Sequence, residues 1–247
     1  MSVLTFLGRG SAFTDEHNCA FFKYNNKLYL LDCPMSAFHK LVNNSELLSG
    51  IIEIVIMVTH THSDHIGGIP MLIHYCFYNA KIPVTVICPC QEIINDMYYF
   101  INNMDGCDNN AYRIVGVNQI DLGFTVRAIP TRHAMQLSGK CFGYFIGIGD
   151  KAIVYTGDTC TLQPFVNFLG KGTYLYTELA YYKSPVHLWM NDVLGILKGY
   201  ANNGVKVFVM HLDNEKEIRA RLEGSKIKIA PLYRKSEDKN DKRSSWK

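Results

Sequence analysis

The feature that most constrains the fold is an apolar run, residues 51–58, followed almost at once by a six-residue block of mostly ligand-type side chains, residues 60–65. The run reads Ile-Ile-Glu-Ile-Val-Ile-Met-Val and is apolar at nearly every position. This pattern indicates a strand buried on both faces, not one that alternates between core and solvent. Residues 71–78 predict a helix. The block therefore lies where a buried strand ends and a helix begins.

The block itself reads His-Thr-His-Ser-Asp-His. Residues i and i+2 of an extended chain project to the same side, so His60 and His62 can bind one ion together. Asp64 and His65 follow within one turn and can hold a second ion beside the first. Packing requires no such density of imidazole and carboxylate groups, whereas Zn²⁺ or Mn²⁺ is suited to it. The block therefore predicts a metal site.

The rest of the chain alternates between strand-like and helix-like segments. Apolar runs between turn residues predict strands at residues 3–7, 20–24, 27–32, 84–88, 124–129, 142–148, 152–156, 173–179 and 205–210. Helices are predicted at residues 35–42, 91–101, 187–200 and 214–222, and a polar loop at residues 102–110. This alternation indicates an α/β fold.

Three more ligand-type residues, His133, Asp158 and His211, each follow a predicted strand. With the block, they resemble the HxHxDH signature and downstream ligands of the metallo-β-lactamase superfamily, over about residues 3–213. The resemblance implies an αββα sandwich, in which two mixed sheets pack face to face with helices outside and metals at one sheet edge. It also implies two divalent ions (Zn²⁺ or Mn²⁺) with Asp158 as the bridging ligand. The implied ligand sets are His60, His62 and His133 for one ion, and Asp64, His65 and His211 for the other.

Two further polar residues, Glu178 and His187, resemble the Glu and His of the phosphodiesterase branch, which includes the RNase Z tRNA 3′-endonucleases. The resemblance implies that His187 protonates the leaving alkoxide and that Glu178 orients it, since a sugar alkoxide leaves poorly without a proton donor. Asp64 is a catalytic candidate as well as a ligand. The ligands alone leave the substrate open, because such a centre can also open a β-lactam or cleave a thioester.

The spacing of the ligands bears on the substrate. RNase Z enzymes carry an arm for the tRNA elbow between the third histidine and the bridging aspartate, but here only 25 positions separate His133 from Asp158. A predicted hairpin occupies them. The compact chain is similar to the anti-Pycsar type of small phosphodiesterase, which implies hydrolysis of cyclic mononucleotide signals, as in immune evasion, and a homodimer. An RNase Z-like RNA 3′-endonuclease, a lactam or thioester hydrolase, and a binding protein without turnover remain alternatives.

Charge separates the chain into two parts. The net charge is +3, and residues 234–247 hold six basic and three acidic residues, so this tail carries the whole net charge. We expect residues 1–233 to form the hydrolase domain and residues 234–247 to be a basic, disordered tail. A neutral body argues against a partner such as long nucleic acid, which binds a basic face, and favours a small nucleotide.

The eight cysteines form no CxxC pair, and residues 1–10 lack the features of a signal peptide. No apolar run is long enough to span a membrane. These observations predict a cytoplasmic protein with reduced thiols and no membrane partner.

One aromatic residue, Tyr112, follows the predicted polar loop of residues 102–110. An aromatic side chain on a polar loop can stack on a base, so Tyr112 is the candidate for substrate binding. In the dimeric phosphodiesterases that this chain resembles, a loop from one protomer helps to close the active site of the other. His17, His39 and His74 match nothing in the motif and are expected to be structural or surface residues.

Overall fold

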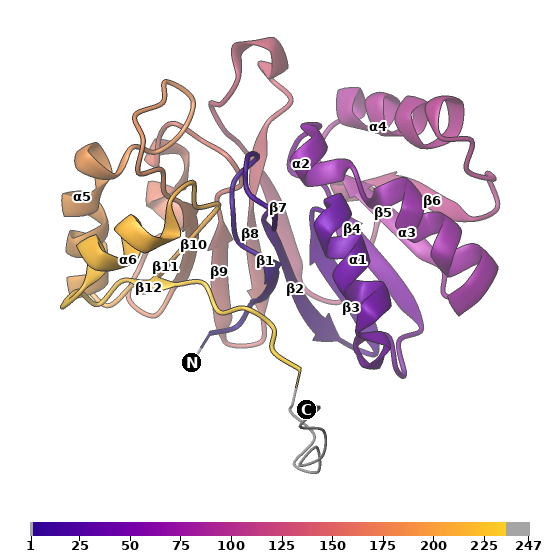
Figure 1. Ribbon diagram of the computed structural model, residues 1–247, viewed down its shortest axis with the longest axis horizontal. Helices are drawn as coiled ribbons and strands as arrows, with labels where there is room; N and C mark the ends of the chain where they lie inside the picture. The colour runs from indigo at the N-terminus through magenta and orange to yellow at the C-terminus, as the bar shows by residue number, and fades with distance from the viewer. Residues whose placement is uncertain (1, 236–247) are drawn as a thin grey trace, which may run out of the picture.

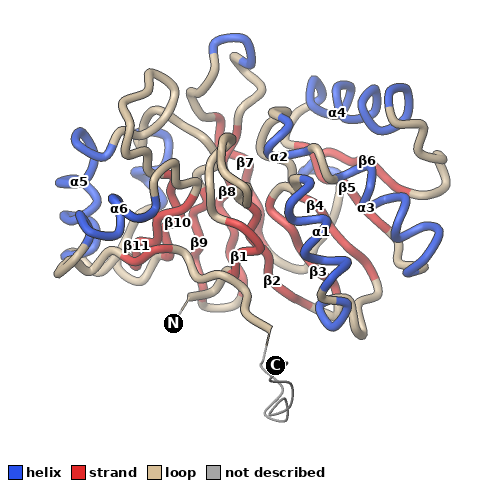
Figure 2. The backbone as a smooth tube through the Cα atoms, in the orientation of Figure 1, coloured by secondary structure: helices blue, strands red, loops and turns tan. Residues whose placement is uncertain are grey.

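The computed structural model describes residues 2–235, which form two six-stranded sheets packed face to face with helices on both outer faces (Figures 1 and 2). This arrangement confirms the αββα sandwich. Of the expected disordered tail, residues 236–247 lie outside the described residues.

Each sheet is mixed. In the first, β3 to β6 run parallel, and β2 lies antiparallel between β3 and β1. Its strands, in order, are β1 (Thr5–Gly8), β2 (Cys19–Tyr24), β3 (Lys27–Leu31), β4 (Glu53–Met57), β5 (Val84–Cys88) and β6 (Tyr112–Gly116). In the second, β9 to β12 run parallel, and β7 and β8 are antiparallel. Its strands are β12 (Lys228–Ile229), β11 (Lys206–Met210), β10 (Tyr174–Glu178), β9 (Lys151–Tyr155), β8 (Phe142–Ile148) and β7 (Thr125–Pro130).

Helices cover the two outer faces (Figure 1). The first sheet is covered by α1 (Met35–Asn43), α3 (Ile69–Tyr75) and α4 (Gln91–Tyr98), and the second by α5 (Met190–Asn202) and α6 (Glu215–Leu222). Three apolar clusters result, one between the sheets and one beneath each helix layer. Because β4 contributes to both the inner and the outer cluster of its sheet, four of its five residues are buried, as its apolar run predicts.

Three expected boundaries are wrong. The helix expected at residues 91–101 is α4, which continues as a π-helical turn, Tyr99–Met104, into the expected polar loop. Residues 112–116 form β6, the edge strand of the first sheet, so Tyr112 lies on a strand and not on a loop. The run Tyr-Arg-Ile-Val-Gly has strand propensity, but the arginine at its second position masks the apolar pattern. The helix expected from His187 begins at Met190, which leaves His187 in the preceding loop.

All eight cysteines are free. No helix within residues 2–235 combines the length and the apolar character needed to cross a bilayer.

Candidate metal centre

The polar residues singled out in the sequence converge where strands of both sheets end. His60 follows β4, Asp158 follows β9, Glu178 is the last residue of β10 and His211 follows β11. Parallel strands place their carboxyl ends at one edge of a sheet, and the facing sheets bring the two edges together. The short helix α2 (Ser63–Ile66) adds Asp64 and His65 at the same edge (Figure 1).

Two backbone features place the ligands from the second sheet. Gly157 has a φ of +58°, and a Cβ there would meet the carbonyl oxygen of Phe142 at 2.6 Å. Only glycine fits this turn, which carries the chain from β9 to Asp158. His211 itself has a φ of +52°, an uncommon conformation for a residue with a side chain. Such conformations cluster at functional sites, where the surrounding structure holds them.

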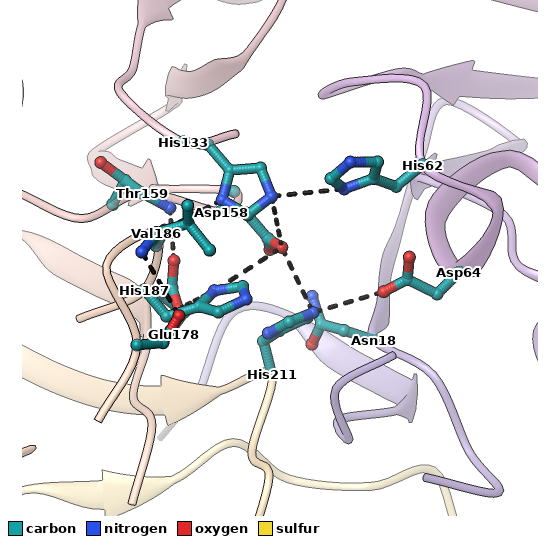
Figure 3. A network of polar contacts seen from close by, with 12 residues as sticks. Asn18, His62, Asp64, His133, Asp158, Thr159, Glu178, Val186, His187 and His211 are labelled. Atoms are coloured by element: carbon teal, nitrogen blue, oxygen red, sulfur yellow. Dashed lines mark hydrogen bonds and ion pairs between the residues drawn. The ribbon is translucent and has the colours of Figure 1, made fainter. Parts of the chain in front are cut away.

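One group of donor atoms comes from three histidines. His62 Nδ1 lies 3.0 Å from His60 Nε2 and 3.2 Å from His133 Nε2. The three nitrogens all lie within 4.8 Å of one another, so a single ion can contact all three. The sequence places these residues on two different loops, after β4 and after β7, and the fold brings them together (Figure 3).

A second group lies beside the first. Oδ2 of Asp64 is 3.4 Å from His65 Nε2 and 3.5 Å from His211 Nε2. Asp158 lies between the groups, because its Oδ1 is 3.5 Å from His65 Nε2 and its Oδ2 is 3.4 Å from His211 Nε2 and 3.7 Å from His133 Nε2. The structure therefore brings together all seven residues that the sequence singled out as ligands.

Two atoms in the centre show that the residues fit a cation. His65 Nε2 and Asp158 Oδ1 are buried and, among residues 2–235, form no hydrogen bond, although they lie 3.5 Å apart. Burying polar atoms without partners is costly, so such atoms require an explanation. A divalent ion beside them would satisfy both, and imidazole nitrogens with carboxylate oxygens are a donor set that Zn²⁺ and Mn²⁺ accept.

One buried carboxylate, Asp32, fixes the tautomers of two of these histidines. Its Oδ2 accepts a hydrogen bond of 2.8 Å from His65 Nδ1 and another of 2.8 Å from the Thr59 hydroxyl. Because the Thr59 hydroxyl donates to Asp32, its oxygen must accept from His60 Nδ1, 3.0 Å away. Both histidines are thereby protonated at Nδ1, which leaves each Nε2 free to bind an ion.

His133 is oriented in the same way by the backbone. Its Nδ1 donates to the carbonyl oxygen of Val186 at 2.9 Å, so its Nε2 points at the ligand cluster (Figure 3). Burial lowers the pKa of His60, His62 and His133, so these imidazoles are neutral at pH 7, as ligands must be.

Neighbouring histidines keep the carboxylates of Asp158 and Asp64 ionised in spite of their burial. Burial opposes the charge of Asp158, but the neighbouring His211 and His65 hold its pKa well below the usual range. The same two histidines lower the pKa of Asp64 against its burial. Burial likewise disfavours a charged His65, yet Asp158 and Asp32 raise its pKa. The carboxylates thus favour positive charge at this position, which a metal ion supplies.

A buried acid and a histidine face the ligand cluster from the second sheet. Glu178 Oε2 lies 2.7 Å from His187 Nδ1, and Glu178 Oε1 accepts from the backbone N–H of Thr159. His187 Nδ1 is also 4.0 Å from Asp158 Oδ2 (Figure 3). Burial opposes a charged His187, but the hydrogen bond and the charge of Glu178 raise its pKa to about 9. The imidazole is therefore protonated at neutral pH.

Comparisons with known proteins identify the family to which the chain belongs. Residues 29–212 match the family model of the beta-lactamase superfamily domain. The chain belongs to this superfamily. Among solved structures, the metallo-beta-lactamase fold protein YhfI from Bacillus subtilis aligns with a TM-score of 0.72 at 16% sequence identity, covering 94% of this chain and 95% of that one.

Two curated relatives cover nearly all of the chain. The Anti-Pycsar protein Apyc1 of Bacillus phage vB_BsuM-Goe3 is 25% identical over an alignment of 244 positions, gaps included. The alignment covers 87% of this chain and 90% of that protein. A ribonuclease Z of Methanococcus maripaludis is 22% identical over an alignment of 269 positions, gaps included, that covers 82% of this chain and 84% of that protein. As a member of the beta-lactamase superfamily with these relatives, the chain is a metal-dependent hydrolase.

The structure places Tyr112 away from the centre of this superfamily member. Tyr112 pairs with Val84 at the start of β5, whereas the ligands lie beyond the carboxyl end of β4, which is parallel to β5. Its ring packs against the outer apolar cluster of the first sheet. Within one chain Tyr112 therefore does not reach the ligand cluster.

The sequence singled out the candidate ligands but not the groups that orient them. Asp32 is the last residue of a predicted strand, and Thr59 lies between the apolar run of residues 51–58 and the block of residues 60–65, so neither position by itself marks a residue that orients a histidine. The carbonyl of Val186 has no signal in the sequence, because any residue supplies a carbonyl. A threonine directly before a ligand histidine is the signal that could have revealed the link through Thr59.

Proposed function

We propose that this chain is a binuclear metal-dependent phosphodiesterase that hydrolyses cyclic nucleotides. The observation that carries the proposal is the ion pair of 2.7 Å between Glu178 and His187 beside the ligand cluster. It provides a protonated imidazole where a leaving group would depart. A sugar alkoxide needs such a proton donor, whereas a thiolate leaves well without one. The Anti-Pycsar relatives support the cyclic nucleotide as substrate.

The proposed ligands divide as the distances suggest, with His60, His62 and His133 on one ion, Asp64, His65 and His211 on the other, and Asp158 shared. When bound, two divalent ions supply Lewis-acid stabilisation of the phosphoryl oxygens and activate water at neutral pH. In this proposal Asp64 accepts the proton of the attacking water as well as serving as a ligand.

His187 and Glu178 act on the departing side. His187 Nδ1 is held by Glu178, so Nε2 is the atom that donates a proton to the leaving alkoxide. Glu178 is fully buried and fixed by the Thr159 backbone, which keeps the imidazole in one orientation. Since the same carboxylate raises the pKa of His187 to about 9, the donor is charged under physiological conditions.

The space around the centre favours a small substrate. The β8–β9 hairpin occupies most of the interval between His133 and Asp158, and the rest is a short loop with the 3₁₀ turn Met135–Leu137. A pocket of 340 Å³ borders the metal-binding loop and is lined by Thr61, Ser63, Ile66, Asp96, Tyr99, Phe100 and Met104. A pocket of this size fits a mononucleotide.

The second candidate is an RNase Z-like RNA 3′-endonuclease, which the ribonuclease Z relative supports. Both reactions use the same ligands and the same proton donor, so the two differ only in what reaches the centre. The short His133–Asp158 interval argues against the endonuclease.

All eight cysteines are free, which supports a reducing, cytoplasmic setting.

We also propose a homodimer in which Tyr112 of one protomer lies near the active site of the other. Tyr112 lines an outer hollow of 480 Å³ together with Tyr98 and Tyr99, whose side chains are 47% and 61% exposed. Exposed aromatic side chains are typical of protein interfaces. Because Tyr112 does not reach the centre of its own chain, contact with substrate requires the second copy.

A substrate panel tests the proposed function. The Mn²⁺-loaded enzyme is offered cyclic mononucleotides, cyclic dinucleotides, a precursor tRNA and a β-lactam at equal enzyme concentration, with Asp158→Ala as the control for contaminating activity. We expect turnover of a cyclic nucleotide that the control lacks. Faster cleavage of the precursor tRNA would establish the endonuclease instead.

A further inference from the structure

A second cluster of ligand-type side chains lies on the outer layer of the first sheet. His74 belongs to α3, and Asp105 and Cys107 follow the π-helical turn Tyr99–Met104. The cluster shares no residue with the centre at the strand ends. Its three donor atoms all lie within 4.8 Å of one another.

The donor separations match those of a zinc site. His74 Nε2 is 3.0 Å from Asp105 Oδ2 and 3.5 Å from Cys107 Sγ, and Cys107 Sγ is 3.8 Å from Asp105 Oδ2. Bond lengths of about 2.0 Å to nitrogen and oxygen and about 2.3 Å to sulfur give tetrahedral donor separations of roughly 3.3–3.6 Å. Each observed separation is therefore close to the value that an ion among the three atoms requires.

The arrangement differs from a catalytic Cys–His–Asp relay. In a relay the histidine contacts its carboxylate through one ring nitrogen and its nucleophile through the other. Here Nε2 of His74 contacts both Asp105 and Cys107. Without an ion, the Nε2–H of His74 can donate to Asp105, and the Cys107 thiol has only long contacts of 3.8 Å to Asp105 Oδ2 and to the carbonyl oxygen of Pro70, whereas an ion would bind all three donor atoms at once.

The three proposed donor residues differ in how far they are buried. Cys107 is only 2% exposed, and the side chains of His74 and Asp105 are 29% and 36% exposed. Tyr78 stacks on the His74 ring with an interplanar angle of 14° and limits its rotation. The buried sulfur and the stacked ring are held in place, while the exposed carboxylate leaves a path for an ion and a position for water.

We propose that His74, Asp105 and Cys107 bind a Zn²⁺ ion, with water as the fourth ligand. Binding converts the Cys107 thiol to a thiolate, so the S–H proton passes to solvent as the Zn–S bond forms. A cysteine thiol is ordinarily protonated at neutral pH, so the proton is present before zinc binds. Each ion bound should therefore release about one proton.

The ion ties the segment after α4 to α3. The π-helical turn that precedes Asp105 also contributes Tyr99, Phe100 and Met104 to the pocket beside the metal-binding loop. Zinc at this position holds one wall of that pocket in place. The inference does not depend on which substrate the pocket takes.

Cobalt substitution tests the site without an activity assay. The proposed ligands at the strand ends contain no sulfur, so a sulfur-to-cobalt charge-transfer band in the near ultraviolet reports only the outer site. We expect the Co²⁺-loaded protein to show this band and Cys107→Ser to lose it. Cys90→Ser, which changes a partly accessible cysteine outside the cluster, should retain it. Two partly exposed positions supply further variants, His74→Gln and Asp105→Asn, each of which should weaken Co²⁺ binding at least tenfold.

Zinc content provides the second measurement. The wild type should bind one more Zn²⁺ per chain than Cys107→Ser, and calorimetry in buffers of different ionisation enthalpy should show about one proton released per outer ion. A cobalt band that survives in Cys107→Ser, or equal zinc content in the two proteins, would overturn the proposal. Failure of cyclic nucleotide hydrolysis would leave these results unchanged, so the two proposals fail separately.

Discussion

At the scale of single residues, replacing Asp32 should lower metal affinity while the protein still folds. Asp32 holds His65 directly and His60 through Thr59. Asp32→Asn keeps the size of the side chain but turns one acceptor into a donor, which opposes these hydrogen bonds. Loss of such an outer ligand contact should lower metal affinity about 10- to 100-fold, as measured by competition with a chelator. Glu46→Gln, at an exposed carboxylate that contacts Tyr233 and Lys235, should leave affinity unchanged. Equal affinity in both variants would contradict the role of Asp32.

His187 should distinguish substrates by their leaving groups. His187→Ala should slow hydrolysis of a cyclic mononucleotide by roughly 10²- to 10⁴-fold, because the alkoxide then leaves without a proton. The same change should affect bis-p-nitrophenyl phosphate much less, since its nitrophenolate needs no proton. Steady-state rates on both substrates provide the test. Equal losses would assign His187 to metal or substrate binding instead.

The pH dependence follows from the same pair. His187 is the proton donor only below its pKa of about 9, so kcat/KM for the cyclic nucleotide should fall as pH rises through that region. Glu178→Gln removes the charge that raises this pKa, so the fall should move to lower pH. With bis-p-nitrophenyl phosphate the fall should be absent. A profile unaffected by Glu178→Gln would rule out His187 as the titrating acid.

At the scale of the elements, the turn between α2 and α3 is held by a close backbone approach. A Cβ on Gly68 would meet the carbonyl oxygens of Pro34 at 2.4 Å and Cys33 at 3.0 Å. Gly68→Ala should therefore destabilise the fold by about 1–3 kcal/mol in urea denaturation. The control is Gly195→Ala inside α5, where nothing lies within 4 Å of the new methyl group. It should stabilise by about 0.5–1 kcal/mol, because alanine loses less backbone entropy in a helix. The opposite order of stabilities would contradict this account of the turn.

Elements with a clear apolar period were predictable, and those fixed by tertiary contacts were not. The run before His60 indicated β4, and the apolar hairpin between His133 and Asp158 indicated β8 and β9. Buried strands require apolar residues, and these are visible directly in the sequence. Edge strand β6 was missed because its partial exposure allows an arginine at its second position. The π-helical turn Tyr99–Met104 was missed because polar asparagines there resemble a loop. Among the site residues, the ligands were recognisable by type and spacing, whereas the contacts through Asp32, Thr59 and Val186 depend on the fold.

At the scale of the whole molecule, the proposed dimer makes Tyr112 a measurable contact. Light scattering should give a mass of twice 28.1 kDa. Tyr112→Ala should raise KM for a cyclic mononucleotide, because the side chain is proposed to lie at the partner's active site. Metal content and hydrolysis of bis-p-nitrophenyl phosphate should stay nearly unchanged, which separates this effect from damage to the centre. A monomeric mass, or an unchanged KM, would remove Tyr112 from the substrate site.

The sandwich as a whole brings residues from two sheets to one edge, and the central claim is that this edge directs water onto a cyclic phosphodiester. Hydrolysis in isotopically labelled water tests it most directly. Mass spectrometry of the nucleoside monophosphate product should find one labelled oxygen per molecule, on the phosphate. Asp158→Ala should give no labelled product. Recovery of the cyclic nucleotide intact, while precursor tRNA is cleaved under the same conditions, would contradict the account.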